Sequence, residues 1–358
     1  MNHFTSRQMA LLLTFLFPLS RMILFPASLA FSAGTGGISV VILCMALELL
    51  VCVAVIWLWK STKMSYFQLI TDIFGVWAGK IVACLYALLF FVKLILILSS
   101  QKLMMFNVLY ENVSQYILFL PIVVLLGYAG SKNSNSVARV FEISAWFVMV
   151  AFLGIMVLSA SAVDFYNILP IFPAGGAGIL ETAVAYPLYF GDFTFFLMFY
   201  STVRKDFKSE WKMLFAWLIN FVITVGFIIV FFGVFGTLSA GGTYAISNLS
   251  KYTVAFSQIG RYDFLFILVV GFGFIVLALA LFHALLFAGE FVGGKRWIWS
   301  LVTAVVLFFA VKIASENFEI VMKFFMQYFS IFAIALQFIL PITMAVIAKV
   351  KARKKHEI

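Results

Sequence analysis

The sequence predicts an all-α membrane protein of about ten transmembrane helices, built as a five-plus-five inverted repeat in which helices 1 and 6 are broken. The first supporting observation is composition, because 65% of the 358 residues are hydrophobic and only 11% are charged. Soluble domains are roughly 45–50% apolar and about 25% charged, so this composition excludes a soluble protein. The second observation is a succession of long apolar segments. The third is that two of these segments, five apart, are interrupted by proline and polar residues.

The apolar segments set the expected domain organisation. A helix needs about 20 mostly apolar residues to cross the hydrocarbon core of a bilayer. The fourth segment is the shortest and contains Pro121. We expect residues 1–358 to form a single membrane domain, with repeats covering approximately 9–162 and 181–348. The ten segments are approximately 9–33, 37–59, 81–109, 115–130, 140–162, 181–203, 211–238, 262–290, 297–314 and 321–348.

The basic residues predict the orientation. Most of the 24 lysines and arginines fall at alternate segment ends, from Arg7 to the run between Lys349 and Lys355. Cytoplasmic loops carry the excess of positive charge, so we expect both termini in the cytoplasm and an even number of spans. The net charge of +10 is divided among short loops and forms no single patch. It therefore indicates a lipid bilayer as the partner and not nucleic acid.

The first segment is interrupted between Pro18 and Pro26. Each proline removes a backbone donor and clashes with the preceding turn. Freed backbone groups at membrane depth need protein or a water-filled cavity around them, and discontinuous helices of this kind form transporter binding sites. The alternative is a kinked packing helix whose arginine pairs with a buried acid. The predicted substrate-binding residues here are Leu19, Ser20, Arg21 and Met22.

The sixth segment carries the matching interruption. Pro187 is followed by a glycine and an acid within the central zone of the segment. Paired interruptions at corresponding positions of two halves are the best sequence indication of a transport-type site. The predicted substrate-binding residues here are Tyr186, Tyr189, Gly191 and Asp192, with Lys93 from the third segment.

Four ionisable residues lie near the middle of their segments and form a predicted intramembrane charge network. Charges at this depth are costly unless they are paired or hydrated, so we expect all four to face the interior. We predict that Arg21 approaches Asp192, with Lys93 or Glu48 nearby. A zwitterionic ligand such as an amino acid would then exchange partners with these groups. The alternatives are a permanent structural network, and a proton-coupling role for Lys93. The four residues are Arg21, Glu48, Lys93 and Asp192.

The outward loops differ in character. Residues 33–37 read as a tight glycine turn, and the prolines and glycines of 164–180 argue against a continuous helix there. Residues 239–262 form the longest outward loop. This loop is interpreted either as a lid or partner surface, or as a solvated connector.

The sequence contains no catalytic or metal-binding motif, so we expect neither an enzyme nor a cofactor. Cys44, Cys52 and Cys84 have no metal-ligand spacing and are expected to be small buried apolar residues. His283 is expected to bond to a neighbouring helix and not to relay protons.

Several short stretches, in order and at the expected spacing, carry a family resemblance. They are Phe4–Gln8, Leu24–Pro26 with Leu29-Ala30 and Ala33-Gly34, Gly130 with Ala138–Ile143, and Asp164–Ile171. Through them the chain resembles the spore germination permease family, the integral-membrane B subunits of nutrient germinant receptors. That family is related to the amino acid–polyamine–organocation transporters. The chain departs from the family pattern at Leu19–Arg21, where a glycine-containing sequence is usual, and after Glu142, where a proline is usual.

The resemblance implies a ligand held between spans 1 and 6 and flanked by spans 3 and 8. It also implies a receptor that senses a small nutrient, such as an amino acid, and takes part in triggering germination beside an A subunit and a lipoprotein C subunit. The location would then be the cell membrane or the spore inner membrane. Two alternatives stay open: a proton-coupled secondary transporter of an amino acid or amine, and an assembly subunit that binds no ligand.

Overall fold

The computed structural model describes residues 4–108, 115–132, 134–171, 175–206, 208–251 and 263–356. Within these residues, seven helical stretches are long and apolar enough to cross a membrane, and three shorter apolar helices accompany them. The protein is therefore an all-α, multi-pass integral membrane protein. The seven stretches are Phe25–Ser61, Val76–Val108, Asn135–Ala162, Ser209–Gly241, Ile267–Val292, Arg296–Glu316 and Phe318–Lys351.

Every predicted segment corresponds to helical structure, although the ends differ. Pro121 lies inside α6, which continues on both sides of it. The exact number of crossings and the inverted repeat stay predictions. The continuous helices are α3 (Gly37–Ser61), α4 (Tyr66–Phe74), α5 (Val76–Val108), α6 (Gln115–Gly130), α7 (Ser134–Ser159), α10 (Ser209–Phe235), α12 (Asp263–Val292) and α13 (Arg296–Glu316). Helices α14 (Phe318–Phe324), α15 (Ser330–Ile334) and α16 (Leu340–His356) are joined by the π-helical turns η10 (Phe325–Phe329) and η11 (Ala335–Ile339).

The first segment is broken, as predicted. Pro18 and Pro26 each stand in the first turn of a new helical piece, where a missing N–H costs nothing. The open carbonyls of Met22 and Ile23 accept hydrogen bonds of 3.0 and 2.9 Å from the backbone of α11 (Ala245–Lys251). The break is therefore satisfied inside the protein. Its pieces are α1 (Ser6–Leu11), η1 (Leu12–Leu16), η2 (Phe17–Arg21) and α2 (Phe25–Ala33).

The sixth segment is broken at a similar place. Gly191 has φ +81°, a backbone conformation that side chains with a Cβ rarely adopt. The residues from Phe190 to Asp192 separate the pieces on either side. These pieces are α8 (Gly175–Ala185), η6 (Pro187–Tyr189), α9 (Phe193–Phe199) and η7 (Tyr200–Thr202). The short strands β1 (Phe4–Thr5) and β2 (Val203–Arg204) pair in parallel and join the start of the first broken helix to the end of the second.

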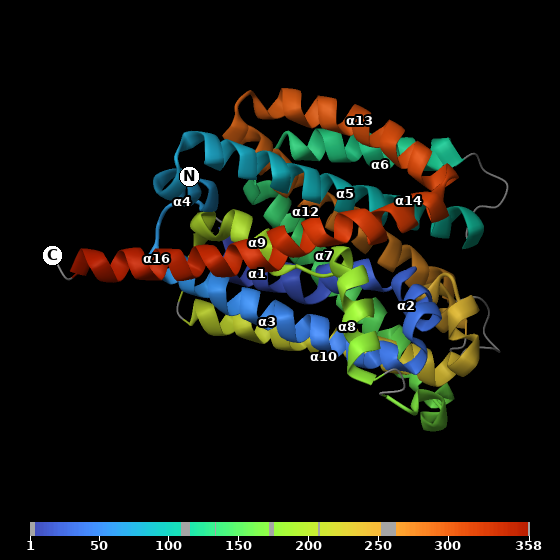
Figure 1. Ribbon diagram of the computed structural model, residues 1–358. Helices are drawn as coiled ribbons and strands as arrows, with labels where there is room; N and C mark the ends of the chain where they lie inside the picture. Colours follow the sequence, from blue (N-terminus) through green and yellow to red (C-terminus); the bar gives the residue numbers. More distant parts are fainter. Residues whose placement is uncertain are drawn as a thin grey trace.

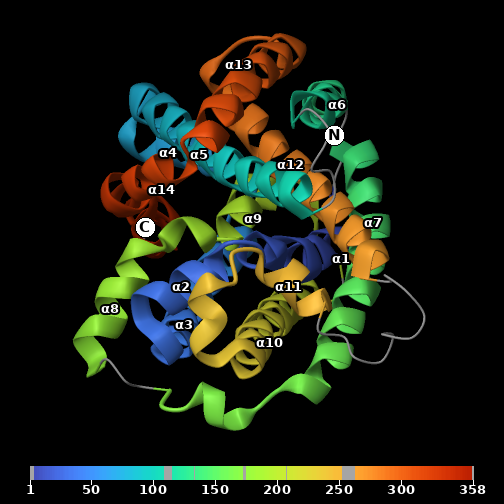
Figure 2. The same ribbon diagram turned by 90° about the vertical axis from the view of Figure 1, so that its right-hand side faces the viewer.

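The bundle has a defined centre. Helix α12 packs along α5 and α7, and α10 packs along α3 and α1. In Figure 1 the helices run across the view, with α13 and α6 at one edge and α10 and α8 at the other. Both chain ends lie at the same end of the bundle (Figure 1). Figure 2 looks along the bundle and shows α12 between α5 and α7, with the broken first helix below it.

Two expectations are corrected. Helix α8 begins at Gly175, before the predicted start of the segment at 181, because a helix satisfies backbone groups near hydrocarbon even where glycine is a poor helix former. Pro173, in the same loop, lies outside the described residues. Cys84 is exposed, while Cys44 and Cys52 are buried as expected. Cys84 belongs to α5, whose apolar and polar residues are not separated onto different faces, so the sequence could not indicate which face meets lipid.

The loops that the sequence predicts to face outward take short helical forms. The turn after α2 is η3 (Gly34–Gly36), with Gly34 at φ +55° as a glycine turn requires. Further short turns are η4 (Ala160–Ala162), η5 (Phe165–Ile168) and η8 (Gly236–Gly241). The described part of the long loop 239–262 is not a solvated connector, because α11 is largely buried and bonds to the first break.

A buried tyrosine ties the last segment to the bundle and supplies a first prediction. The Tyr86 hydroxyl donates a 2.7 Å hydrogen bond to the carbonyl of Leu336 in η11. Tyr86→Phe leaves that buried acceptor unsatisfied, so we expect a loss of about 1–3 kcal/mol in the free energy of unfolding. The measurement is the unfolding midpoint of the purified protein in detergent. Tyr166→Phe, at an 86% exposed tyrosine, is the control and should change nothing.

Candidate functional site

The two breaks are joined by a buried ion pair. Arg21 Nη2 lies 2.7 Å from Asp192 Oδ2, and Arg21 Nε donates to the carbonyl of Tyr189 at 2.8 Å. The side chains of Arg21 and Asp192 are 1% and 2% exposed. Charges at this depth persist only when they are paired and hydrogen-bonded. The predicted approach of Arg21 to Asp192 is thus present in the structure.

Helix α10 supplies polar side chains that bond to the ion pair. Arg21 Nη1 donates to Asn220 Oδ1 at 3.1 Å and to Thr224 Oγ1 at 3.3 Å. Asn220 Nδ2 donates to Asp192 Oδ2 at 2.8 Å and to the carbonyl of Leu13 at 2.9 Å. Asn220 therefore touches both charges and the first helix. Sequence reasoning missed this residue, although two polar residues four apart in the apolar segment 211–238 were the available signal.

Glu48 of α3 binds the backbone of the sixth-segment break. Its Oε1 accepts hydrogen bonds from the backbone N–H groups of Gly191 and, at 2.7 Å, Asp192. Arg21 Nη2 lies 3.5 Å from the same oxygen. The other oxygen, Oε2, is buried with no partner among the described residues. Glu48 thus supplies the acceptor for two N–H groups that the broken helix cannot satisfy.

Lys93 completes the set of four charges. Its Nζ donates to the carbonyl of Phe190, the residue before the glycine of the break. The ring of Phe190 lies 4.6 Å from the Arg21 guanidinium carbon, a cation–π distance. All four charged residues face the protein interior, at 6% exposure or less. Two positive and two negative groups meet here, so their formal charges cancel.

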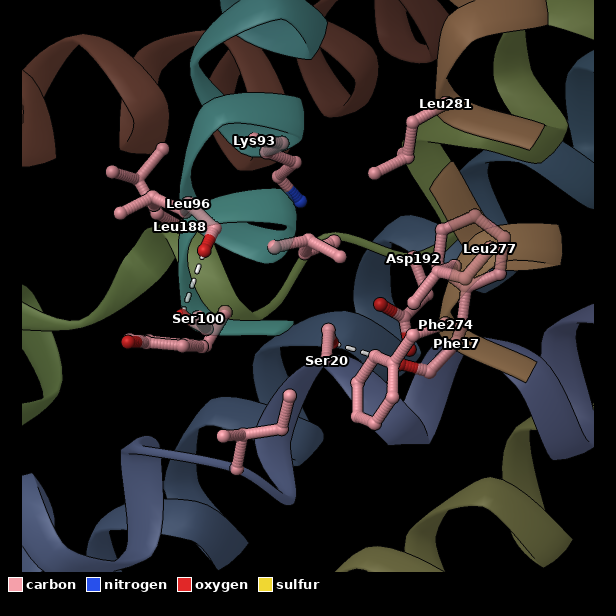
Figure 3. A pocket seen from close by; sticks show the side chains of 13 residues that line it. Phe17, Ser20, Lys93, Leu96, Ser100, Leu188, Asp192, Phe274, Leu277 and Leu281 are labelled. Carbon is pink, nitrogen blue, oxygen red and sulfur yellow. Dashed lines mark hydrogen bonds between the residues drawn. The ribbon is translucent and has the colours of Figure 1, made fainter. Parts of the chain in front are cut away.

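A small cavity lies beside these charges (Figure 3). In Figure 3 Lys93 points its amine toward the middle of the cavity, and Asp192 lies across from it with Phe274 and Leu277. The space open to the centre of a water molecule is about 20 Å³, which is room for roughly one water. The lining residues are Phe17, Ser20, Ile23, Lys93, Leu96, Ile97, Ser100, Leu188, Tyr189, Asp192, Phe274, Leu277 and Leu281.

The predicted binding residues divide into two groups. Ser20, Lys93, Tyr189 and Asp192 line the cavity. The others lie behind it: Leu19 and Met22 are buried, Arg21 and Gly191 serve the charge network, and the Tyr186 hydroxyl donates to the carbonyl of Ser28 at 3.2 Å. Their role in binding stays a prediction.

Gln337 packs against the sixth-segment break and was not predicted. A Cβ added to Gly191 would lie 1.8 Å from Gln337 Oε1. Both amide atoms of Gln337 are buried and have no partner among the described residues. The residue belongs to the π-helical turn η11, a feature that often marks functional sites. Only the tertiary packing brings this glutamine to the break.

Comparison with known proteins shows the family to which the chain belongs. The model of the spore germination protein family matches residues 5–292. The chain belongs to this family. The match ends at the last residue of α12, so it covers every site residue described above except Gln337. None of the curated proteins compared with the chain matches it.

Solved structures with a similar fold are transporters. One is a manganese transporter of Eremococcus coleocola in complex with an aromatic bis-isothiourea substituted compound. It is 12% identical to this chain with a TM-score of 0.58, and the match covers 94% of this chain and 77% of the transporter chain. Two single-residue mutants of that transporter are each 13% identical, with TM-scores of 0.58 and 0.59, and cover 95% of this chain and 78% of theirs. The chain therefore has a transporter-like fold, and its family points to a non-enzymatic membrane protein.

The stretches that carried the resemblance also meet in space. Gln8 Nε2 donates to Glu142 Oε2 at 3.1 Å, and Arg7 Nε lies 3.3 Å from Glu142 Oε1. The start of the first broken helix is thus bonded to α7. The bond expected from His283 to a neighbouring helix is present, because Nη2 of Arg296 in α13 lies 2.9 Å from His283 Nδ1.

Proposed function

We propose that this protein binds a small zwitterionic nutrient, most simply an amino acid, between its two broken helices and takes part in triggering germination. The observation that carries the proposal is the meeting of two helix breaks at a neutral cluster of four buried charges beside a cavity. Broken helices that face each other are the usual construction of a substrate site in this class of fold.

The chemistry of the site supports a ligand with both charges. The carboxylate of Asp192 lines the cavity and matches a ligand ammonium, and the Lys93 amine lines it and matches a ligand carboxylate. A neutral centre accepts a zwitterion without a change in net charge, whereas a singly charged ligand leaves one buried charge uncompensated. The site thus favours amino acids over simple amines or carboxylic acids.

Binding requires the site to open. The present cavity has room for about one water, which is too small for any amino acid. Glu48 already accepts the hydrogen bonds of the two backbone N–H groups at the break, and Arg21 is already paired with Asp192. The ligand must therefore exchange partners with these side chains, and the exchange would move the broken helices. Such a movement is the signal that a receptor subunit would pass to its partners.

Manganese is a poor candidate ligand despite the similar fold. The ammonium of Lys93 lines the cavity and the guanidinium of Arg21 contacts Asp192, so both repel a divalent cation. The described residues contain no group of three His, Cys, Asp or Glu side chains that could hold a metal ion.

A proton-coupled transporter of amino acids or amines is the second candidate. Its support is the transporter-like fold, together with a buried lysine and a buried carboxylate oxygen of Glu48 that has no partner in the described structure. Uptake of labelled amino acid into proteoliposomes distinguishes the two functions, because a receptor subunit binds without sustained flux. Recovery with a larger membrane partner and a lipoprotein, as A and C subunits, favours the receptor. Both proposals have the termini in the cytoplasm.

The experiment that tests binding is thermal unfolding of the purified protein with a panel of amino acids, amines and carboxylic acids. We expect at least one amino acid to raise the unfolding midpoint, since a ligand at 100 times its Kd adds about 2.7 kcal/mol of stability. Ser20→Phe fills the cavity beside the charges and should abolish the shift. Ser32→Phe makes the same change at an exposed position of α2 and should keep it.

Two outcomes would contradict the proposal. If no compound in the panel shifts the midpoint, the charges are a structural network and the protein is an assembly subunit. If Ser20→Phe responds as the unaltered protein does, the ligand binds elsewhere.

A further inference from the structure

A long apolar groove separates α6 from α13 on the outside of the bundle, away from the charge cluster. We call it the α6–α13 groove; its volume is about 620 Å³. Figures 1 and 2 show these two helices side by side at one edge of the molecule. The groove residues are Leu120, Val123, Val124, Gly127, Tyr128 and Ser131 of α6 with the turn after it, and Trp297, Leu301, Ala304, Val305 and Phe308 of α13.

The floor of the groove is closed by small residues. Ser300 Oγ donates a 2.6 Å hydrogen bond to the carbonyl of Gly127, and a Cβ on Gly127 would lie 3.2 Å from that of Ala304. The walls are outward-facing, with Val124 62% and Leu301 60% exposed. In a chain that crosses the membrane, exposed apolar walls of this kind face hydrocarbon, and the groove has the apolar character that suits an acyl chain.

One end of the groove has the character of the membrane interface. Tyr128 and Trp297 stand there at 64% and 58% exposure. Tyrosine and tryptophan gather at the level of lipid head groups. The Lys132 Nζ lies 4.4 Å from the centroid of the Tyr128 ring, and Lys295, exposed, directly precedes α13. Two lysines therefore flank this end of the groove, one just after α6 and one just before α13.

Arg296 also lies at this end of the groove, but its side chain is engaged in bonds within the protein and is not available to a head group. Its Nε donates to the carbonyl of Gly130 at 2.9 Å, and its two terminal nitrogens lie 3.3 Å from Glu290 Oε2 and 2.9 Å from His283 Nδ1. These bonds join the ends of α6, α12 and α13. In the described part of the chain, Lys132 and Lys295 form no comparable ion pair.

From these features we propose that the α6–α13 groove binds an anionic phospholipid. One acyl chain lies along the apolar walls, and the phosphate lies between Lys132 and Lys295. Lipid tails are equally apolar everywhere in a bilayer, so the groove alone cannot select a lipid. Selection comes from the head group, and each lysine near the surface contributes about a fivefold preference for an anionic lipid.

The test is native mass spectrometry of the purified full-length protein equilibrated with equal amounts of phosphatidylglycerol and phosphatidylcholine of the same acyl chains. We expect retained lipid to be mainly phosphatidylglycerol, and the double variant K132Q/K295Q to lose most of that preference. The matched control is Lys63→Gln, which removes an exposed lysine from the α3–α4 loop at the same end of the bundle. It should keep the preference.

The groove itself is tested with a bulky substitution that changes no charge. Val124→Trp fills the groove and should reduce retained phosphatidylglycerol, whereas Val222→Trp, at a 59% exposed position of α10, should not. Unchanged retention in both K132Q/K295Q and Val124→Trp overturns the proposal. It is also overturned if K63Q loses the preference equally, which indicates general attraction to the basic face. Displacement of the lipid by soluble glycerol phosphate, undiminished in Val124→Trp, indicates a free-phosphate site and no lipid groove.

Discussion

Arg21→Ala is expected to cost the protein about 3–5 kcal/mol of stability, because it leaves two buried carboxylates facing one lysine. Arg21 contacts Asp192 at 2.7 Å and Glu48 at 3.5 Å, and the side chains of both acids are almost fully buried. The same change removes the donor to the Tyr189 carbonyl. The measurement is the unfolding midpoint in detergent, together with the fraction of protein that elutes as a single species.

The double variant R21A/D192A identifies the partner. It removes one charge of each sign and leaves Glu48 with Lys93, so it should be more stable than R21A alone. We expect a coupling energy of about 0.5–3 kcal/mol between the two sites, the range for residues in direct contact. Additive losses would contradict a direct interaction. Arg7→Ala is the control, because the Arg7 side chain is 63% exposed and its salt bridge to Glu142 lies near the surface. It should lower the free energy of unfolding by less than about 1 kcal/mol.

Gly191→Ala is expected to have the second large effect, for two separable reasons. The added Cβ would lie 1.8 Å from Gln337 Oε1, and the backbone φ of +81° disfavours any residue with a Cβ. The backbone at the break must then shift. This backbone donates N–H groups to Glu48 and accepts a hydrogen bond from Lys93, so the shift disturbs both side chains. We expect both a lower unfolding midpoint and loss of any ligand-induced shift.

Two companion variants separate the clash from the backbone strain. Gly34→Ala places a Cβ at φ +55° with nothing within 4 Å, so it should show only the backbone strain, about 1–3 kcal/mol. The double variant G191A/Q337A removes the clash and should recover stability toward the Gly34→Ala level. If Gly191→Ala costs no more than Gly34→Ala, the close packing of Gln337 on the break is not important for the fold.

The lipid and ligand experiments report on different parts of the protein. Ser20 and the charge cluster lie between the broken helices, whereas the α6–α13 groove lies at the edge of the bundle. Failure of the amino-acid panel would leave lipid selection by Lys132 and Lys295 unaffected. Failure of the lipid test would leave the binding proposal unaffected.

The sequence by itself determined the features that strong local chemistry imposes. Apolar composition required a membrane fold, and the prolines that stand beside polar residues, Pro18, Pro26 and Pro187, predicted helix breaks there. The cost of a charge in hydrocarbon was enough to predict that all four intramembrane charges face inward and that Arg21 meets an acid.

Only the tertiary structure decided the rest. Asn220 and Gln337 are neutral, so their placement in an apolar segment carries too small a cost to predict where they point. Glu48 could have paired with either cation, and its choice of the backbone at the break depends on how α3 packs on α9. When nearly every helix face is apolar, periodicity no longer distinguishes lipid from protein. The cavity, the bonds from α11 to the first break and the α6–α13 groove therefore depend on packing between segments far apart in the chain.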